Sequence, residues 1–287
     1  MEVETPILSI AGTTDLYIDS MVTHAGLEQD VTLYLQTSPE FAMKRLLAAG
    51  SGAIYQLAKV FRYAEYGRQH HPEFTMLEWY RPGFDHRQLM DEVDALVREL
   101  LRDRLSLQPT LKWTYRQAWQ QTLNIDPFTA APDELQAYAL QQGIETVGDM
   151  EDKDAWLQLI MNYCIEPALP RETPVFIYDY PASQAALAKV RQEPNPVAER
   201  FELYINGMEL ANGFHELTDA NEQRQRFAED NKKRRRAGKR QIPMDEKLLG
   251  ALNSLPDCAG VALGFDRVMM LAGGKDNIQA VLSFEST

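Results

Sequence analysis

The chain contains little cysteine and no long apolar run. Its 287 residues include two cysteines, Cys164 and Cys258, at a spacing typical of neither a zinc site nor a disulfide framework. We therefore expect a reducing compartment, the cytoplasm, and a packing role for Cys258. No apolar stretch approaches the ~18 residues of a membrane helix, and no signal peptide is recognisable. These absences argue against a membrane partner and against a cysteine-based metal centre.

Positive charge is also scarce. The chain has 29 lysines and arginines against 42 acidic residues, a net charge of −13, so its surface as a whole would repel nucleic acid. The exception is residues 232–240, KKRRRAGKR, where seven of nine residues are basic. Such a run is ordinarily the solvated end of a helix, and docking of an acidic partner is the alternative.

Internal repeats, low-complexity tracts and abrupt changes of composition are absent as well. The proportions of hydrophobic and charged residues, 45% and 25%, are ordinary for a globular protein. The sequence therefore predicts a single domain over residues 1–287.

The segment from Phe201 to Leu217 is the most informative part of the chain. Asn206-Gly207 is a strong signal for a two-residue hairpin turn, because both residues tolerate positive φ. Pairing outward from this turn sets Leu203 opposite Leu210, and Glu202 opposite Ala211. The predicted hairpin then has an apolar face and an acidic face. The apolar face comprises Leu203, Ile205, Met208 and Leu210, and the acidic face comprises Glu202, Tyr204, Glu209 and Ala211.

The acidic face predicts a cation site. Glu202 and Glu209 are diagonal neighbours, roughly 7–8 Å apart at the backbone, which suits a divalent ion that carries phosphates. The alternative is a hairpin whose outer face is merely wet and acidic. Strict alternation would bury Asn212 and Glu216 on the apolar face, which is costly for unpaired polar groups. We therefore predict a β-bulge near residues 211–213 that turns both toward the carboxylates.

Other segments place further polar residues on regular elements. A helix is expected to begin at Pro39 with Ser38 as its N-cap. Strands over 53–62 and 74–81 form an antiparallel hairpin in which Glu78 and Tyr80 face the same way. A glycine-spaced strand from residue 259 runs into a helix that carries Arg267 in its first turn. Further helices are predicted over 86–103, 113–123, 132–142, 152–164 and 220–236, with a buried strand over 175–180.

Three segments together resemble a known family. FRYAEYGRQHHPEFTMLEWY, RFELYINGMELANGFHEL and GVALGFDRVMML occur in the order and spacing of the class II aminoacyl-tRNA synthetase signature. Within that class the chain is similar to the lysyl branch, and most similar to the freestanding paralogues that attach (R)-β-lysine to translation elongation factor P. The resemblance covers nearly the whole chain. It implies an α+β fold, the class II catalytic core, with a mostly antiparallel six- or seven-stranded sheet flanked by helices.

The resemblance also bears on assembly. In the family a long helix precedes the Thr-Pro that is Thr5-Pro6 here. We expect this helix to be missing from the chain, together with the anticodon-binding domain of true lysyl-tRNA synthetases. The helix builds much of the family's dimer interface, so a homodimer is expected of a chain that includes it.

The resemblance implies roles by position. Arg62 and Arg267 are the catalytic arginines, on the substrate carboxylate with the α-phosphate and on the γ-phosphate. Mg²⁺ is held by Glu202 and Glu209. The ATP site comprises Arg62, Tyr63, Ala64, His71, Glu209, Leu210, Gly264 and Arg267. The site of the amino acid comprises Ser38, Pro39, Glu40, Tyr80, Asn212 and Glu216, with Tyr80 and Glu216 on the side-chain ammonium.

Two departures from the family pattern have consequences. Ala64 replaces the glutamate near the adenine, so Glu65 is the candidate substitute, and His71 replaces an asparagine. Loss of one polar contact is worth about 1 kcal/mol. Ala262 replaces a glycine of lysyl-tRNA synthetases, which agrees with a β-amino rather than an α-amino substrate.

The sequence leaves three candidate functions. The first is an ATP-dependent ligase for (R)-β-lysine and elongation factor P. The second is a lysyl-tRNA synthetase, disfavoured because few residues remain to hold tRNA. The third is a non-catalytic regulatory paralogue, against which the intact Arg62, Glu202, Glu209, Glu216 and Arg267 argue.

Overall fold

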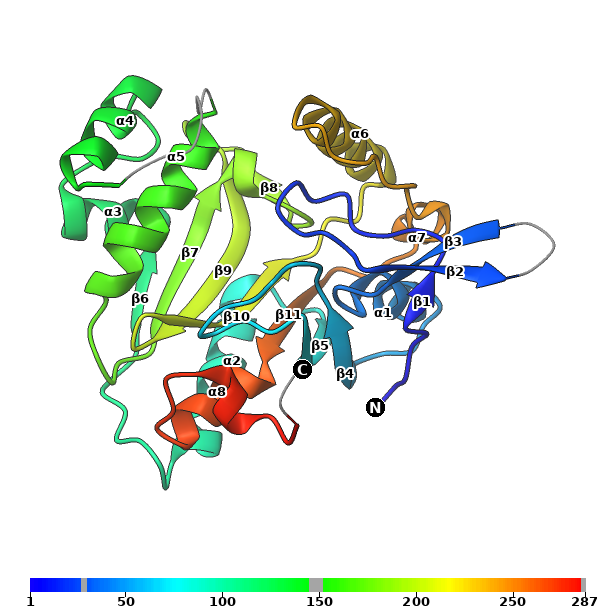
Figure 1. Cartoon of the computed structure of the whole chain (residues 1–287), viewed down its shortest axis with the longest axis horizontal. Helices are drawn as coiled ribbons and strands as arrows, with labels where there is room; N and C mark the ends of the chain where they lie inside the picture. The colour runs from blue at the N-terminus through cyan, green and yellow to red at the C-terminus, as the bar shows by residue number, and fades with distance from the viewer. Residues whose placement is uncertain (27–29, 145–151, 285–287) are drawn as a thin grey trace.

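The computed structural model describes residues 1–26, 30–144 and 152–284, and its core is a large mixed sheet (Figure 1). All neighbouring strands pair antiparallel except β6 and β7, which confirms the mostly antiparallel sheet that the resemblance implied. A short strand, β8 (Val190–Arg191), adds to β9 beside the main path. In spatial order the strands are β4 (Ile54–Phe61), β5 (Glu73–Pro82), β11 (Cys258–Gly264), β10 (Met208–His215), β9 (Val197–Ile205), β7 (Val175–Pro181) and β6 (Leu111–Thr114).

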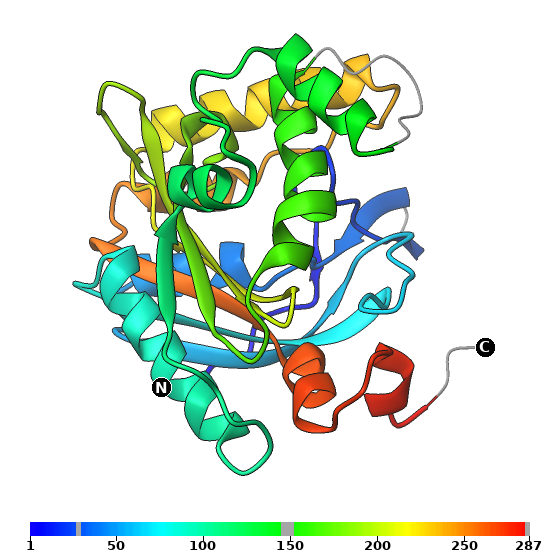
Figure 2. The same cartoon turned by 90° about the vertical axis from the view of Figure 1, so that its left-hand side faces the viewer.

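One face of this sheet carries a large apolar core and is covered by two helices. Helices α2 (His86–Leu101) and α8 (Phe265–Ala272) pack there, and they lie on the same side in both views (Figures 1 and 2). Helix α2 begins at a capping box in which Asp85 and Gln88 satisfy each other's backbone N–H groups. The apolar residues of the hairpin belong to this core: Leu203, Ile205, Met208 and Leu210.

The opposite face is covered by two separate groups of helices. Over β6 and β7 lie α3 (Tyr115–Leu123), α4 (Pro132–Gln141) and α5 (Lys153–Ile160), which share one core. Over β4 and the end of β5 lie α1 (Glu40–Ala48), α6 (Ala220–Arg236) and α7 (Glu246–Leu252), which share another. The middle of this face is left for a cavity. Short helical turns complete the chain: Met161–Ile165, Glu166–Ala168, Ala182–Gln184 and Ile278–Val281.

A second, small sheet lies near the N-terminus. It has the order β1–β3–β2 and is built from Leu8–Ser9, Asp30–Leu35 and Val22–Gly26. No sequence expectation covered these strands, which are short and half exposed. Among the described residues, none of the helices is both long and apolar enough to cross a membrane.

The predicted register of the 201–217 hairpin is wrong beyond its first two pairs. Asn206 and Gly207 form the turn with positive φ, and Glu209 opposes Tyr204 as expected. A bulge then intervenes between Glu209 and Ala211, so Leu203 opposes Ala211 and Glu202 opposes Asn212. The extra residue is Leu210, one position before the range where a bulge was predicted. As a result Asn212 joins the acidic face, whereas Ala211 joins the apolar core.

The basic run over 232–240 is only in part the solvated helix end that was expected, because two of its residues bind other parts of the chain. Docking of an acidic partner stays a prediction. Arg234 is 2% exposed, and its guanidinium donates to the Asp15 backbone oxygen and to the Asp19 carboxylate. Lys239 also pairs with Asp19, at 2.8 Å. These contacts fasten the segment 15–19 to the C-terminal end of α6.

Candidate active site

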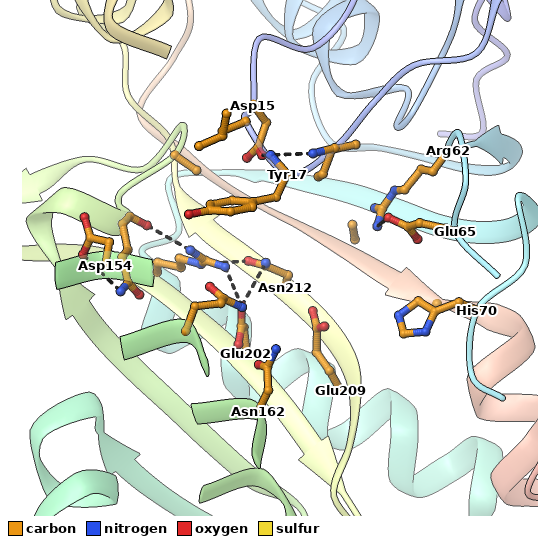
Figure 3. A pocket seen from close by; sticks show the side chains of 18 of the residues that line it. Asp15, Tyr17, Arg62, Glu65, His70, Asp154, Asn162, Glu202, Glu209 and Asn212 are labelled. Carbon is orange, nitrogen blue, oxygen red and sulfur yellow. Dashed lines mark hydrogen bonds and ion pairs between the residues drawn. The ribbon is translucent and has the colours of Figure 1, made fainter. Parts of the chain in front are cut away.

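A cavity of about 670 Å³ opens on the sheet face between the two helix groups. Its floor is formed by β5, β9, β10 and β11, and its walls include the segment 15–18, the loop after β4 and residues of α5 and α6. Figure 3 shows Glu202, Glu209 and Asn212 on the floor, with Arg62, Glu65 and His70 on one side. Eight of the predicted site residues line it: Arg62, His71, Glu202, Glu209, Leu210, Asn212, Gly264 and Arg267.

Glu202 lies at the centre of a hydrogen-bond network on the cavity floor. One carboxylate oxygen accepts from the hydroxyls of Tyr180 and Tyr204. The other accepts from the Arg200 guanidinium at 2.5 Å and from the Asn212 amide at 3.2 Å. Because a carboxylate offers about four lone-pair positions, this side chain is fully satisfied. The network fixes Glu202 and Asn212 side by side.

Glu209 is less constrained. Its side chain is 37% exposed, and its carboxylate lies 3.6 Å from the Arg267 guanidinium. Burial, and next the nearby Glu202 carboxylate, raise the pKa of Glu209, while Arg267 acts in the opposite direction. Glu209 therefore has unused acceptor positions in a region of excess negative charge, where a cation would be stabilised.

Arg267 is oriented by its surroundings. Its guanidinium donates to the backbone oxygen of Glu209 at 2.7 Å and to that of Gln69 at 3.2 Å. A third contact joins it to Nε2 of His70 at 2.9 Å. Burial, and next Arg267 itself, lower the pKa of His70, so its imidazole is neutral and can accept this hydrogen bond. The hydrogen bonds that hold the arginine at the cavity wall thus come from neutral acceptors, and the Glu209 carboxylate at 3.6 Å is its ion-pair partner.

Arg62 lies across the cavity from the floor carboxylates. Its guanidinium stacks over the Phe74 ring at 5.0 Å and lies 3.7 Å from the Glu65 carboxylate. Its buried Nε has no hydrogen-bond partner among the described residues. A buried, unpaired donor is costly, and a ligand carboxylate or phosphate would satisfy it.

Four further predicted residues belong to a second group beside the cavity: Ser38, Glu40, Tyr80 and Glu216. Tyr80 donates to Glu78 at 2.6 Å, and Ser38 donates to the other oxygen of Glu78 at 2.7 Å. Lys44 lies 2.6 Å from both the Glu40 and the Glu216 carboxylates. We call these residues the carboxylate cluster: Ser38, Glu40, Lys44, Glu78, Tyr80 and Glu216.

The cavity and the carboxylate cluster lie on the same face of the sheet. Gly264 opposes Met76, Ala262 opposes Glu78, and Gly260 opposes Tyr80 along β11 and β5. Directly opposed residues point to the same side, so this face passes from the cavity into the cluster through Ala262. Ala262 also opposes Asn212 on β10 and lines the cavity. Glu216 itself is 1% exposed and does not line the cavity.

Comparison with known proteins identifies the architecture. The family of class II tRNA synthetases (D, K and N) matches residues 1–287. The chain belongs to this family. It is 51% identical over 292 residues to the elongation factor P–(R)-β-lysine ligase of Pseudoalteromonas translucida, which covers all of this chain and 89% of that protein. The ligases of that name from Salmonella dublin and Salmonella typhimurium are each 50% identical over 289 residues, 99% of this chain and 88% of theirs.

Residues of the loop after β4 depart from the class II pattern. In the structure some residues of this loop line the cavity and others do not. Glu65 and His71 line the cavity, as does His70, whereas Tyr63 and Ala64 do not. Tyr63 is 65% exposed, and Ala64 has φ of 60°, a left-handed conformation. This turn directs Glu65 toward Arg62. The assignment of Tyr63 and Ala64 to the ATP site stays a prediction.

Helix α1 starts one residue later than predicted. It begins at Glu40 with Pro39 as the N-cap residue. The Ser38 hydroxyl still accepts from the Glu40 backbone N–H at 3.0 Å while it donates to Glu78. Ser38 thereby links the start of α1 to β5, and Glu40 projects into the carboxylate cluster.

A Mg²⁺ ion with bound phosphates is compatible with these residues. Carboxylate oxygens are its preferred protein ligands, and Glu209 presents such oxygens next to two arginines. Glu202 has its lone pairs occupied, so it can bind a metal only when a donor is displaced. The Asn212 amide, at 3.2 Å the most distant of the four donors to Glu202, is the simplest to displace.

Three important residues were not singled out from the sequence. Lys44 looks like a surface lysine of an amphipathic helix, yet its side chain is 1% exposed. Arg200 lies in a strand beside Glu202 and donates to it. Tyr17 lines the cavity from the N-terminal segment. Only the alternation along β9 pointed to Arg200, because it shares the face of Glu202.

Proposed function

We propose that the protein activates (R)-β-lysine with ATP and transfers it to a lysine side chain of elongation factor P. The observation that carries this proposal is the joining of two sites on one sheet face. Arg62, Glu209 and Arg267 surround a cavity suited to a nucleotide, and the carboxylate cluster beyond Ala262 suits a diamine. The name of the 50–51% identical relatives supplies the substrate and the acceptor.

The first step joins the carboxylate of the amino acid to the α-phosphorus of ATP. A carboxylate oxygen attacks phosphorus, the bond to the β,γ-unit breaks, and pyrophosphate leaves. The protein needs no nucleophile of its own for this step, and its contribution is positioning and stabilisation of charge. Arg62 would hold the substrate carboxylate against the α-phosphate through its planar fork, and its unpaired Nε supports this role. Arg267 would neutralise charge on the terminal phosphate.

Mg²⁺, when bound, supplies further stabilisation of phosphate charge. Glu209, with Glu202 after its donor is displaced, would hold the ion. Asn212 would then be free to donate to the substrate carboxylate, as the family resemblance implies. In the second step the neutral amine of the acceptor lysine attacks the activated carbonyl carbon. An amide bond forms, AMP leaves, and the amine's proton passes to solvent or to the leaving phosphate.

Selection of the amino acid is proposed to lie in the carboxylate cluster. Tyr80 and Glu216 would bind the terminal ammonium, and Ser38, Pro39 and Glu40 would lie near the other amino group. The structure holds this cluster closed, because Tyr80 and Glu216 are 2% and 1% exposed and neither lines the cavity. Entry of a substrate therefore requires Tyr80 or its neighbours to shift.

The test is ATP–pyrophosphate exchange with α-lysine and with both enantiomers of β-lysine, followed by transfer to elongation factor P or to tRNA. We expect exchange with (R)-β-lysine and transfer to the protein. Charging of tRNA would instead establish a lysyl-tRNA synthetase, and absence of exchange with any amino acid would support a regulatory paralogue. A preference for α-lysine would remove the argument from Ala262. Glu216→Gln should lose selection for the substrate ammonium.

A further inference from the structure

The carboxylate cluster contains a cation that none of the predicted roles uses. Lys44 projects from α1, its side chain is 1% exposed, and its ammonium lies 2.6 Å from Glu40 Oε1 and 2.6 Å from Glu216 Oε2. Both partners are residues to which substrate-binding roles are proposed above. A fully desolvated lysine of this kind persists only because both ion pairs compensate its lost hydration.

The charges in the cluster do not balance. Glu40, Glu78 and Glu216 carry three negative charges when ionised, and Lys44 carries one positive charge, which leaves a formal excess of two negative charges. The hydroxyls of Ser38 and Tyr80 stabilise Glu78 by hydrogen bonds but bring no charge. Burial raises the pKa of Glu78 to about 8 and that of Glu216 to about 7, as expected where positive charge is lacking. A ligand with two ammonium groups would balance these carboxylates in their ionised form.

We propose that Lys44 is a positioning residue that sets the specificity of this site for a carboxylic acid bearing two ammonium groups. It neutralises one of the three carboxylates and holds Glu40 and Glu216 apart, each with an oxygen left for a substrate ammonium. This inference rests on the proposed function, because it assumes that the cluster is where the amino acid binds. According to this inference, Lys44 determines how many ammonium groups the substrate carries, although Lys44 itself does not contact the substrate.

The alternative role for Lys44, as a competitor of the substrate, predicts the opposite effect on substrate binding. If Lys44 occupied the place of a substrate ammonium, it would compete with the substrate for Glu216, and its removal would tighten binding. The contacts favour the positioning role, because Lys44 reaches Glu216 from α1 while Tyr80 and Glu78 approach from β5. The β5 side of the cluster holds no cation among the described residues, so it is the side left for a substrate ammonium.

The experiment compares Lys44→Met with wild type by ATP–pyrophosphate exchange and by calorimetric binding of α-lysine and (R)-β-lysine. Methionine keeps most of the side-chain length and removes the charge. We expect KM for the diamino acid to rise about 30-fold or more, as when one partner of a buried charge pair is lost. The kcat value and KM for ATP should change little. Lys44→Arg, which keeps the charge, should recover part of the loss, and exposed Lys247→Met should behave as wild type.

Unchanged KM in Lys44→Met would show a merely structural lysine, and a lower KM would show a competing one; either result overturns the inference. If the Met variant does not fold, the wild-type protein still gives a test. The affinity for lysine should then exceed the affinities for 6-aminohexanoate and for norleucine, which each lack one amino group, by about 30-fold or more. Equal affinities would refute the claim that the cluster requires two ammonium groups. A wild type that binds a diamino acid but does not modify elongation factor P would overturn the proposed function alone. A wild type that binds no diamino acid would overturn both.

Discussion

Replacement of Glu78 by glutamine should make the protein more stable at neutral pH and should remove part of its pH dependence. Glu78 is 2% exposed and accepts hydrogen bonds from Tyr80 at 2.6 Å and from Ser38 at 2.7 Å. Burial, and next the Glu40 carboxylate, raise its pKa from 4.5 to about 8. Glutamine has the same shape, keeps an acceptor oxygen and carries no charge.

The magnitude follows from proton linkage. Because the pKa of Glu78 is higher in the folded than in the unfolded state, the folded state binds more protons between pH 4.5 and about 8. The free energy of unfolding of wild type should therefore fall as pH rises through this window, by about 1.4 kcal/mol per unit. At pH 7 the accumulated loss is roughly 3 kcal/mol. Loss of one hydrogen bond in Glu78→Gln costs about 1 kcal/mol, so a net gain of about 2 kcal/mol remains.

Urea unfolding followed by tryptophan fluorescence measures this gain between about pH 5 and pH 8. The difference in unfolding free energy between Glu78→Gln and wild type should grow in favour of the variant as pH rises. Glu99→Gln is the control, because the Glu99 side chain is 63% exposed. A difference that stays constant across this pH range would refute the reasoning, because Glu78 would then titrate alike in both states.

Three further predictions concern other parts of the site. Gly260→Ala would place a methyl 2.2 Å from the Tyr80 ring, so thermal denaturation should show that the free energy of unfolding falls by about 1–3 kcal/mol. Gly250 is the control, because it lies in α7 with open space around it. Gly250→Ala should raise the free energy of unfolding by about 0.5–1 kcal/mol. Arg234→Met removes hydrogen bonds to the Asp15 oxygen at 2.6 Å and to Asp19 at 2.7 Å, and urea unfolding should show a loss of about 1–3 kcal/mol that exposed Lys232→Met does not share. Glu209→Gln should raise the Mg²⁺ concentration needed for half-maximal pyrophosphate exchange by about tenfold or more, and an unchanged requirement would exclude Glu209 as a ligand.

Local signals predicted much of the fold. Helix α6 has the predicted bounds, Ala220–Arg236, because Asp219 caps its start and the polar pattern continues without a break. The Asn206-Gly207 turn and the shared face of Glu78 and Tyr80 follow from turn chemistry and strand alternation alone. The class II resemblance supplied the mostly antiparallel sheet flanked by helices, which no local pattern could, and the order of its strands was not predicted.

The sequence predictions fail where tertiary packing determines the register of a strand or the burial of a charged side chain. The position of the bulge at Leu210 has no side-chain signal, since a leucine fits the core in either register. Lys44 and Arg234 look solvent-exposed in any sequence pattern, and each is buried by carboxylates or carbonyls from distant segments. Charged residues that are buried by distant partners cannot be recognised from helical periodicity.

The extra residue in β10 reverses the alternation of side chains between the two faces of the sheet part-way along that strand. On the turn side of Leu210 the odd-numbered Glu209 faces the cavity, and beyond it the even-numbered Asn212 does so. Deleting one residue there would rotate everything from Ala211 to His215 by half a turn, removing Asn212 from Glu202 while leaving Glu209 in place. A change in the length of this strand would therefore separate the proposed metal ligand Glu209 from Asn212, which is proposed to bind the amino acid.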